Sequence, residues 1–329
     1  MALADELQES WYGDRRTPAW TYPLAALYGG LAALRRLLYR ARILRHVRLP
    51  VPVVVVGNLT AGGTGKTPLT LALVEALRRR GWRPGVVSRG YGGMQREPAL
   101  LDAQPDPARF GDEPCLIRAA GTPVAVGRDR PAAAALLVAA GCDVVIADDG
   151  LQHYRLARDV EICVVDGARR FGNGRLLPAG PLREPLSRLR RVDFRVANGA
   201  AGPDEFAMRL VGGTAVALVD GEERPLASFA GTPVAALAAI GYPDRFFESL
   251  RAQGLTVDGH AFPDHHAFDA ADLAFAGARP LLMTDKDAIK CVRFARPGWW
   301  RAPIRAELPE AFLDALDLRL HQARARRDP

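Results

Sequence analysis

Residues 57–67 combine glycines, a lysine and a hydroxyl side chain at the spacing that binds the phosphates of a nucleotide. In such a loop the glycines let backbone N–H groups converge on phosphate oxygens, the lysine reaches the β- and γ-phosphates, and the next hydroxyl ligates Mg²⁺. The strict pattern requires glycine where this chain has Thr60. We predict that Lys66 is catalytic and that Thr67 binds the metal. The predicted nucleotide contacts are Thr60, Ala61, Gly62, Gly63, Thr64, Gly65, Lys66 and Thr67.

The segments on either side of this loop are those that a phosphate-binding loop requires. Val53 to Val56 form a continuous β-branched run, which is typical of a parallel strand buried on both faces. After Pro68, apolar residues recur at helical spacing, and the pattern stops near Gly81. Because the N-terminus of such a helix adds positive potential at the phosphates, we favour a phosphate loop over a plain glycine-rich turn.

A second set of candidate residues ends another predicted strand. The apolar run at 143–147 leads into Asp148, Asp149 and Gly150. Carboxylates at the carboxyl end of a buried parallel strand are placed to bind Mg²⁺, although Asp-Asp-Gly is also good turn chemistry. Beside a phosphate loop we favour the metal site. Whether Asp148 or Asp149 touches the metal stays open.

The N-terminal segment has the character of a helix that lies in a membrane surface. Residues 20–34 are uncharged but number only 15, which is short of the ~20 that a spanning helix needs. Leucines recur there at helical spacing, and six arginines without an acid follow between Arg35 and Arg48. A helix packed on its own domain is the alternative. Nucleic acid is disfavoured because the aromatic residues lie among leucines and not among the arginines.

Length and composition limit the remaining possibilities. The 329 residues exceed the size at which one hydrophobic core usually stops growing, so two domains are expected. The four cysteines form no CxxC pair, which argues against a zinc site or a disulfide framework. The net charge of +7 is carried almost wholly by arginine. Lys66, Lys286 and Lys290 are the only lysines, so the last two are candidates for function.

Further polar strings follow predicted strands along the chain. They are Ser88-Arg-Gly-Tyr-Gly-Gly93, Gly111-Asp-Glu-Pro114, Val126-Gly-Arg-Asp-Arg130, Gln152-His-Tyr154, Leu182-Arg-Glu-Pro185 and Phe262-Pro-Asp-His-His266. Together with the phosphate loop and the Asp-Asp-Gly turn, this series resembles the tetraacyldisaccharide 4'-kinase family of lipid A biosynthesis from about Val51 to Cys291. The phosphate loop of that family is itself relaxed at the position of Thr60, whereas Asp285 stands where glutamate is usual.

The resemblance implies an enzyme, a kinase that uses ATP and Mg²⁺. Its reaction would transfer the γ-phosphate to the 4'-hydroxyl of tetraacyldisaccharide 1-phosphate and give the bisphosphorylated precursor lipid IVA. The expected partners are this lipid-linked disaccharide and the membrane surface, contacted through the N-terminal helix. The expected place is the cytoplasmic face of the bacterial inner membrane, as a peripheral or monotopic protein. We expect no nucleic acid partner, and no obligate protein partner is evident.

The resemblance also implies an α/β fold, with a P-loop-containing parallel-sheet domain (α/β/α), a second, smaller α/β/α domain and a short β linker. We place a membrane-associating helix and basic segment in residues 1–48 and the P-loop kinase domain in residues 49–200. The β linker is predicted in 201–225 and the second domain in 226–307. A C-terminal helix in 308–329 could return to the first domain.

The matching strings carry the catalytic residues of the family onto this chain. Asp112 is predicted to be the base that takes the proton of the sugar hydroxyl. His265, from the second domain, is predicted to pair with Asp112, and the choice over His266 stays open. Without the resemblance, Asp112 and Glu113 would also suit an ordinary helix N-terminus.

The same strings supply candidates for the metal and the substrate. Glu113 is predicted to join Thr67 as a ligand of Mg²⁺, with Asp148 or Asp149 completing the site. The predicted substrate contacts are Asn58, Tyr91, Arg128, His153 and Arg183.

Two other functions remain open on sequence alone. A membrane-associated P-loop NTPase, or switch, would hydrolyse nucleotide without a lipid acceptor, and a non-catalytic module would bind ATP without forming a product. The Asn-Lys-x-Asp motif of guanine recognition is absent, since the closest string is Thr284-Asp-Lys-Asp287. Candidate catalytic residues in two domains favour the kinase, because a pair across a cleft suits an acceptor substrate.

Overall fold

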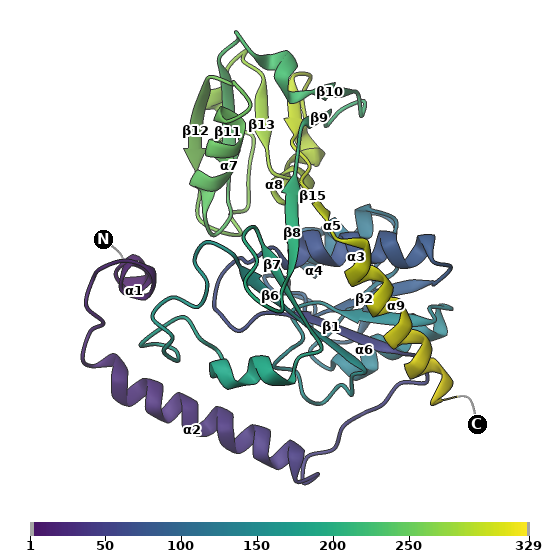
Figure 1. Cartoon of the computed structure of the whole chain (residues 1–329). Coiled ribbons are helices and arrows are strands. Elements are labelled where there is room, and N and C mark those ends of the chain that lie inside the picture. The colour runs from purple at the N-terminus through teal and green to yellow at the C-terminus, as the bar shows by residue number, and fades with distance from the viewer. Residues whose placement is uncertain (1–2, 328–329) are drawn as a thin grey trace.

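Two β-sheets with helices on their faces make up residues 3–327, the part of the chain that the computed structural model describes (Figure 1). The larger sheet contains β1 (Val53–Gly57), β2 (Pro84–Ser88), β3 (Ala99–Leu100), β4 (Val124–Val126), β5 (Val144–Ala147), β6 (Val160–Asp166), β7 (Phe194–Asn198), β8 (Phe206–Val211) and β15 (Arg305–Glu307). The smaller sheet contains β9 (Thr214–Ala217), β10 (Glu223–Pro225), β11 (Val234–Ala238), β12 (Val257–Ala261), β13 (Leu281–Met283) and β14 (Trp299–Arg301). The α-helices are α1 (Leu3–Tyr12), α2 (Thr21–Arg40), α3 (Lys66–Arg79), α4 (Pro107–Phe110), α5 (Asp112–Ala119), α6 (Arg130–Ala139), α7 (Pro243–Arg251), α8 (Asp285–Cys291) and α9 (Glu310–Ala325).

The strand β1 lies inside the larger sheet, whose order is β15-β8-β7-β6-β1-β5-β2-β4-β3. It pairs in parallel with β5 on one side and β6 on the other. Alternate valines of β1 enter two different cores, Val54 and Val56 with residues of α3, α5 and α9, and Val53 and Val55 with residues of α6. Burial on both faces explains why β1 is an uninterrupted β-branched run.

The smaller sheet has the order β10-β9-β14-β13-β11-β12, and its four strands β11 to β14 run parallel. Phe246 and Phe247 of α7 pack in the core on one face, and Ala288 and Cys291 of α8 pack in the core on the other. Each sheet is therefore the middle layer of an α/β/α sandwich, which confirms the predicted fold class.

The smaller sheet is inserted between β8 and β15, which are neighbours in the larger sheet. The chain leaves the larger sheet after Val211 and enters the smaller one at Thr214, and it returns between Arg301 and Arg305. Of residues 201–225, which we predicted to be a β linker, β8 pairs into the larger sheet and β9 and β10 pair into the smaller one.

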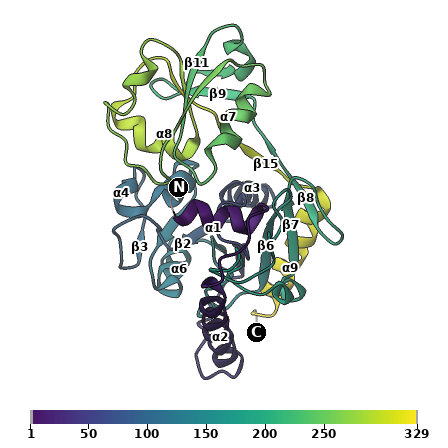
Figure 2. The same cartoon turned by 90° about the vertical axis from the view of Figure 1, so that its left-hand side faces the viewer.

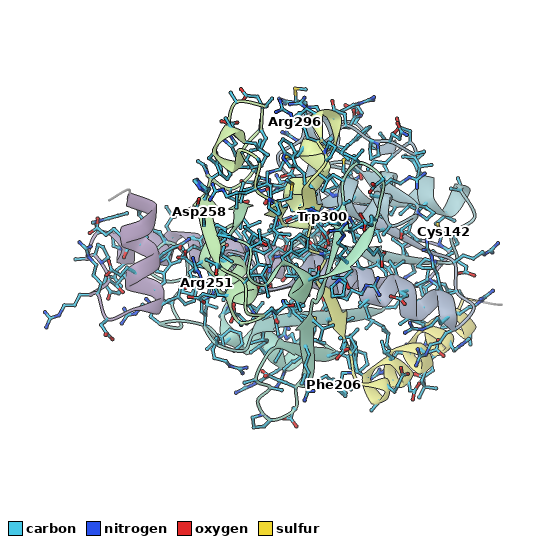
Figure 3. All side chains as sticks on the ribbon, turned by 90° about the horizontal axis from the view of Figure 1, so that it is seen from above. Cys142, Phe206, Arg251, Asp258, Arg296 and Trp300 are labelled. Atoms are coloured by element: carbon cyan, nitrogen blue, oxygen red, sulfur yellow. The ribbon has the colours of Figure 1, made fainter. Side chains whose placement is uncertain are left out.

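The last helix, α9, packs on the larger sheet. Its Phe312 is fully buried, with its ring centroid 5.3 Å from that of Phe194 and 5.2 Å from that of Phe206. Seen from above, Phe206 lies beside the yellow helix (Figure 3). The C-terminal helix thus completes the layer that also contains α3.

The helix α2 extends away from the two sheets, as Figures 1 and 2 show from two directions. It is tied by two contacts to the segment before the short 3₁₀ helix Leu186–Arg191. The Tyr28 hydroxyl donates to the Arg183 carbonyl at 2.9 Å, and Arg36 lies 3.3 Å from a carboxylate oxygen of Glu184. Its exposed leucines are Leu24, Leu27, Leu31, Leu34 and Leu37. Within residues 3–327, none of the helices combines the length and the apolar character needed to cross a membrane.

Candidate active site

The phosphate loop lies between β1 and α3, where two glycines set its shape. Gly62 and Gly65 have φ angles of 100° and 93°, in the left-handed region that favours glycine. A Cβ atom at Gly65 would also come within 2.8 Å of the Asn198 amide nitrogen, which donates to the Thr64 carbonyl. Glycine at position 65 therefore allows the loop to close against the end of β7.

A second segment holds this loop from another side. The Ala61 N–H donates to the Pro181 carbonyl at 2.7 Å, and the Arg183 N–H donates to the Leu59 carbonyl at 2.6 Å. The Arg183 guanidinium then reaches Asp149, with Nη1 lying 3.0 and 3.1 Å from the two carboxylate oxygens. Arg183 is thus brought to the phosphate loop and to the Asp-Asp-Gly turn at once.

The Lys66 ammonium lies between two of the other predicted site residues. Its Nζ is 3.4 Å from Oδ1 of Asn58 and 3.7 Å from Oδ1 of Asp149. Burial alone would raise the pKa of Asp149, but the positive charges of Lys66 and Arg183 outweigh it and hold that pKa below its usual value. The Asp149 carboxylate is therefore ionised at neutral pH, beside the lysine that is predicted to meet the phosphates.

The neighbouring Asp148 is fully enclosed and accepts a hydrogen bond from the Thr70 hydroxyl at 3.1 Å. Burial, followed by the negative charges of Glu113 and Asp149, raises the pKa of Asp148 to about 7. Carboxylates that repel one another in this way are stabilised by a cation, so the residues present fit a divalent metal.

A Mg²⁺ site does not require a preformed cage of protein ligands. Among residues 3–327, no three His, Cys, Asp or Glu side chains converge as a ready-made metal cage. Mg²⁺ commonly uses one or two carboxylates and completes its shell with water and substrate phosphates. The half-buried Thr67 hydroxyl, at the start of α3, is the remaining ligand predicted from the sequence.

Asp112, the first residue of α5 in the larger sandwich, contacts His265, which follows β12 in the smaller sandwich. Nδ1 of His265 lies 3.0 Å from Oδ2 of Asp112, although the residues are 153 positions apart in the sequence. Burial would raise the pKa of Asp112, but the hydrogen bond from His265 and the charges of Lys290 and Lys286 outweigh it and lower that pKa. Asp112 is therefore a carboxylate at neutral pH, which is the form that can accept a proton.

The backbone on both sides of this pair adopts unusual conformations. Gly111 has a φ of 90°, and a Cβ atom there would collide with the Tyr91 carbonyl, so glycine lets the two loops pack together. The Tyr91 ring then lies 5.3 Å from the His265 ring, measured between centroids. His265 itself has a φ of 65°, which is uncommon for a residue with a side chain and is found disproportionately at functional sites.

The adjacent histidine has a different partner. Nε2 of His266 lies 2.9 Å from Oδ2 of Asp272, on the same layer. The contact with Asp112 belongs to His265, so the structure distinguishes two residues between which the sequence left the choice open.

The predicted substrate residues Arg128 and His153 are placed differently from one another, and Arg128 also differs from its neighbour Arg130. Arg128 has an exposed side chain, whereas Arg130 is buried and donates to the Asp149 carbonyl at 2.9 Å. His153 is half-buried, and its Nε2 has no hydrogen-bond partner within residues 3–327. Burial and the charge of Arg130 lower the pKa of His153 to about 3, so its ring is neutral.

Three residues at the site were not among the predicted site residues. Arg130 and Asn198 had no signal beyond the Gly-Arg-Asp-Arg string and a strand end. Lys290 was marked only by the rarity of lysine, and its Nζ lies 3.8 Å from Oδ2 of Asp112. Asp112, His265 and Lys290 all line a groove of about 1630 Å³ between the two layers. The groove is large enough for a ligand beside the pair, and its lining includes none of the phosphate-loop residues 57–67.

Comparisons with known proteins agree on one family and confirm the resemblance. The family model described as LpxK, tetraacyldisaccharide-1-P 4'-kinase, matches residues 18–321. A tetraacyldisaccharide 4'-kinase of Stenotrophomonas maltophilia (strain R551-3) is 52% identical over 326 residues, covering 95% of this chain and 96% of that protein. One from Xanthomonas campestris pv. campestris (strain 8004) is 52% identical over 332 residues, covering 93% and 94%. The crystal structure of "apo" form LpxK from Aquifex aeolicus in complex with ATP has a TM-score of 0.77 at 29% identity, covering 91% of this chain and 97% of that one.

Proposed function

The chain belongs to the tetraacyldisaccharide-1-P 4'-kinase family, and we propose that it transfers the γ-phosphate of ATP to the 4'-hydroxyl of tetraacyldisaccharide 1-phosphate. The product is the bisphosphorylated lipid A precursor, lipid IVA. The observation that carries this proposal is the contact between Asp112 and His265. It joins the sandwich that contains the phosphate loop to the smaller sandwich, and both residues line a large groove. A switch protein that only hydrolyses nucleotide has no need of such a pair.

The proposed reaction uses Asp112 as the base. The acceptor oxygen forms a bond to the γ-phosphorus, the bond from that phosphorus to the β–γ bridging oxygen breaks, and the hydroxyl proton passes to the Asp112 carboxylate. His265 orients that carboxylate through its Nδ1 contact. Lys66 stabilises the negative charge on the transferred phosphoryl group, and the loop N–H groups hold the phosphates.

The proposed ligands of Mg²⁺ are Thr67, Glu113 and one of the two aspartates Asp148 and Asp149. When bound, the ion neutralises phosphate charge and orients the γ-phosphoryl group. The proposed contacts to the substrate are Asn58, Tyr91, Arg128, His153 and Arg183.

We further propose that α2 lies in the cytoplasmic face of the bacterial inner membrane, which makes the protein peripheral or monotopic. This is supported by the outward leucines, of which Leu27 is 61% exposed and Leu31 60% exposed, and by the arginines that follow them. The inner side of α2 contacts Arg183 and Glu184, so the helix would hold the phosphate-loop layer near the lipid surface.

The test is a transfer assay with γ-labelled ATP, Mg²⁺ and detergent-dispersed tetraacyldisaccharide 1-phosphate, run on wild type and Asp112→Asn. We expect label in the lipid with wild type and a loss of at least about 100-fold in the variant, because general-base catalysis typically contributes that much. Labelled inorganic phosphate without labelled lipid, at equal rates in both proteins, would refute the kinase and favour a nucleotide switch.

A further inference from the structure

The Lys290 side chain lies where α8 of the smaller layer meets α5 of the larger one. Its Nζ is 2.9 Å from Oδ1 of Asp287, 3.1 Å from the His266 carbonyl and 3.8 Å from Oδ2 of Asp112. The contact with the His266 carbonyl is a hydrogen bond, whereas the contacts with Asp287 and Asp112 are ion pairs, the second of which is too long for a hydrogen bond. A single ammonium thus faces three oxygen acceptors at once. The side chain is only 8% exposed, and its Nζ lies 4.9 Å from the centroid of the Phe268 ring.

One of the three acceptors is a fixed anchor. Asp287 is fully buried, and its Oδ2 accepts hydrogen bonds from the Thr284 hydroxyl at 2.7 Å and from the Ala239 N–H at 3.1 Å. Ala239 directly follows β11, so the Asp287 carboxylate is attached to the smaller sheet at the carboxyl end of that strand. A buried carboxylate held in this way keeps the ammonium in one place.

The other two acceptors are the Asp112 carboxylate itself and the carbonyl of His266, the residue after His265. The His266 carbonyl directly follows His265, whose φ of 65° has to be held by its surroundings. Asp112 receives Lys290 and His265 at the same oxygen, Oδ2. Lys290 and His265 therefore approach the same side of the Asp112 carboxylate. Its other oxygen, Oδ1, is left for the acceptor hydroxyl.

We propose that Lys290 is a positioning residue for phosphoryl transfer, which holds the Asp112 carboxylate and the His265 loop in register while Asp287 anchors it. This inference rests on the proposed function of Asp112 as the base. Arginine is not an equivalent group, because its planar guanidinium does not match three acceptors around a single nitrogen.

The chain offers a matched control directly after α8. Arg293 donates to the Phe268 carbonyl at 2.9 Å, and within residues 3–327 it forms no hydrogen bond or ion pair with Asp112 or His265. Lys290→Met and Arg293→Met each remove one cation from this region and keep an unbranched apolar stem. Lys290→Met alone also leaves the Asp287 charge buried without its partner, which is strongly destabilising. The double variant Asp287→Asn/Lys290→Met removes both charges and avoids that cost.

The experiment compares kcat and both KM values for lipid transfer in these variants, together with their thermal unfolding midpoints. We expect Lys290→Met and the double variant to lower kcat by about 10- to 100-fold, because small misplacements of a catalytic group have effects of this size. The KM for ATP and for the lipid should change by less than about threefold, since the interaction lost is one with the base. Arg293→Met should retain the wild-type kcat. A double variant with a wild-type kcat would overturn the proposal.

A second background separates positioning from a general structural role. In Asp112→Asn protein, adding Asp287→Asn/Lys290→Met should cause no further loss of the residual kcat, because the group that Lys290 positions no longer acts as a base. An equal fractional loss in both backgrounds would show a structural role and overturn the inference. Absence of lipid product with wild type would instead refute the proposed function itself, so the two failures are distinguishable.

Discussion

Replacing Leu27, Leu31 and Leu34 together by glutamine should detach the protein from membranes. These three side chains are 61%, 60% and 52% exposed on the outer side of α2, so the folded protein alone does not bury them. Full burial of a leucine contributes about 1.5–3 kcal/mol, so three side chains that are a little more than half exposed supply roughly 3–5 kcal/mol on entering lipid. We therefore expect the partition coefficient onto vesicles to fall by about 100- to 5,000-fold.

The assay is co-sedimentation with vesicles of phosphatidylethanolamine and phosphatidylglycerol, measured over a range of lipid concentrations. Leu318→Gln is the matched control, because Leu318 is 60% exposed on α9, at a distance in sequence from α2. The control should sediment like wild type, and both variants should keep the wild-type thermal midpoint because no core residue changes. Partitioning of the triple variant within about threefold of wild type would refute the interfacial role of α2.

Three further outcomes are expected. Lys66→Ala should lower kcat for transfer by on the order of 100-fold or more in the labelled-ATP assay, because charge stabilisation of the phosphoryl group is lost. Folding should be unchanged. A smaller effect on kcat than on the KM for ATP would contradict this role. Phe312→Ala should lower the free energy of unfolding by about 3–5 kcal/mol in urea titrations, because the ring is fully buried between α9 and the larger sheet; a loss under about 1 kcal/mol would contradict that packing. Burial and two neighbouring carboxylates raise the pKa of Asp148 to about 7, so the native state holds this proton more tightly than the unfolded state. Without Mg²⁺, stability should therefore fall as the pH rises from about 4 to about 7 and then level off, and Asp148→Asn should remove that slope in urea titrations between pH 5 and pH 8; an unchanged slope would assign it to another group.

Features that depend on neighbouring residues could be predicted from the sequence. The phosphate loop was recognised because Gly65, Lys66 and Thr67 are consecutive and follow a strand that is buried on both faces. The same local reasoning predicted a C-terminal helix in 308–329, and the structure has α9 at Glu310–Ala325. The α/β class was implied by the family resemblance, the alternation of such strands and helices agrees with it, and the comparisons confirm it.

Contacts that join distant segments were decided by the tertiary structure. His265 and His266 have the same chemistry and adjacent positions, so no local pattern tells which one meets Asp112, 153 residues before His265. Their different directions follow from the left-handed backbone at His265.

The sequence likewise revealed only part of the role of the buried cations around the site. Lysine is rare in this chain, which marked Lys290 as unusual, but its sequence neighbours do not reveal that it contacts the opposite layer. Arg130 and Arg128 share one short string, yet only the first is buried against the Asp-Asp-Gly turn, because α6 begins there and turns its first residue inward. The sequence alone determined the local phosphate-binding chemistry and the kind of layers that carry it. Which side chains meet between the two sandwiches was decided by packing, since each such contact depends on how the two sheets come together.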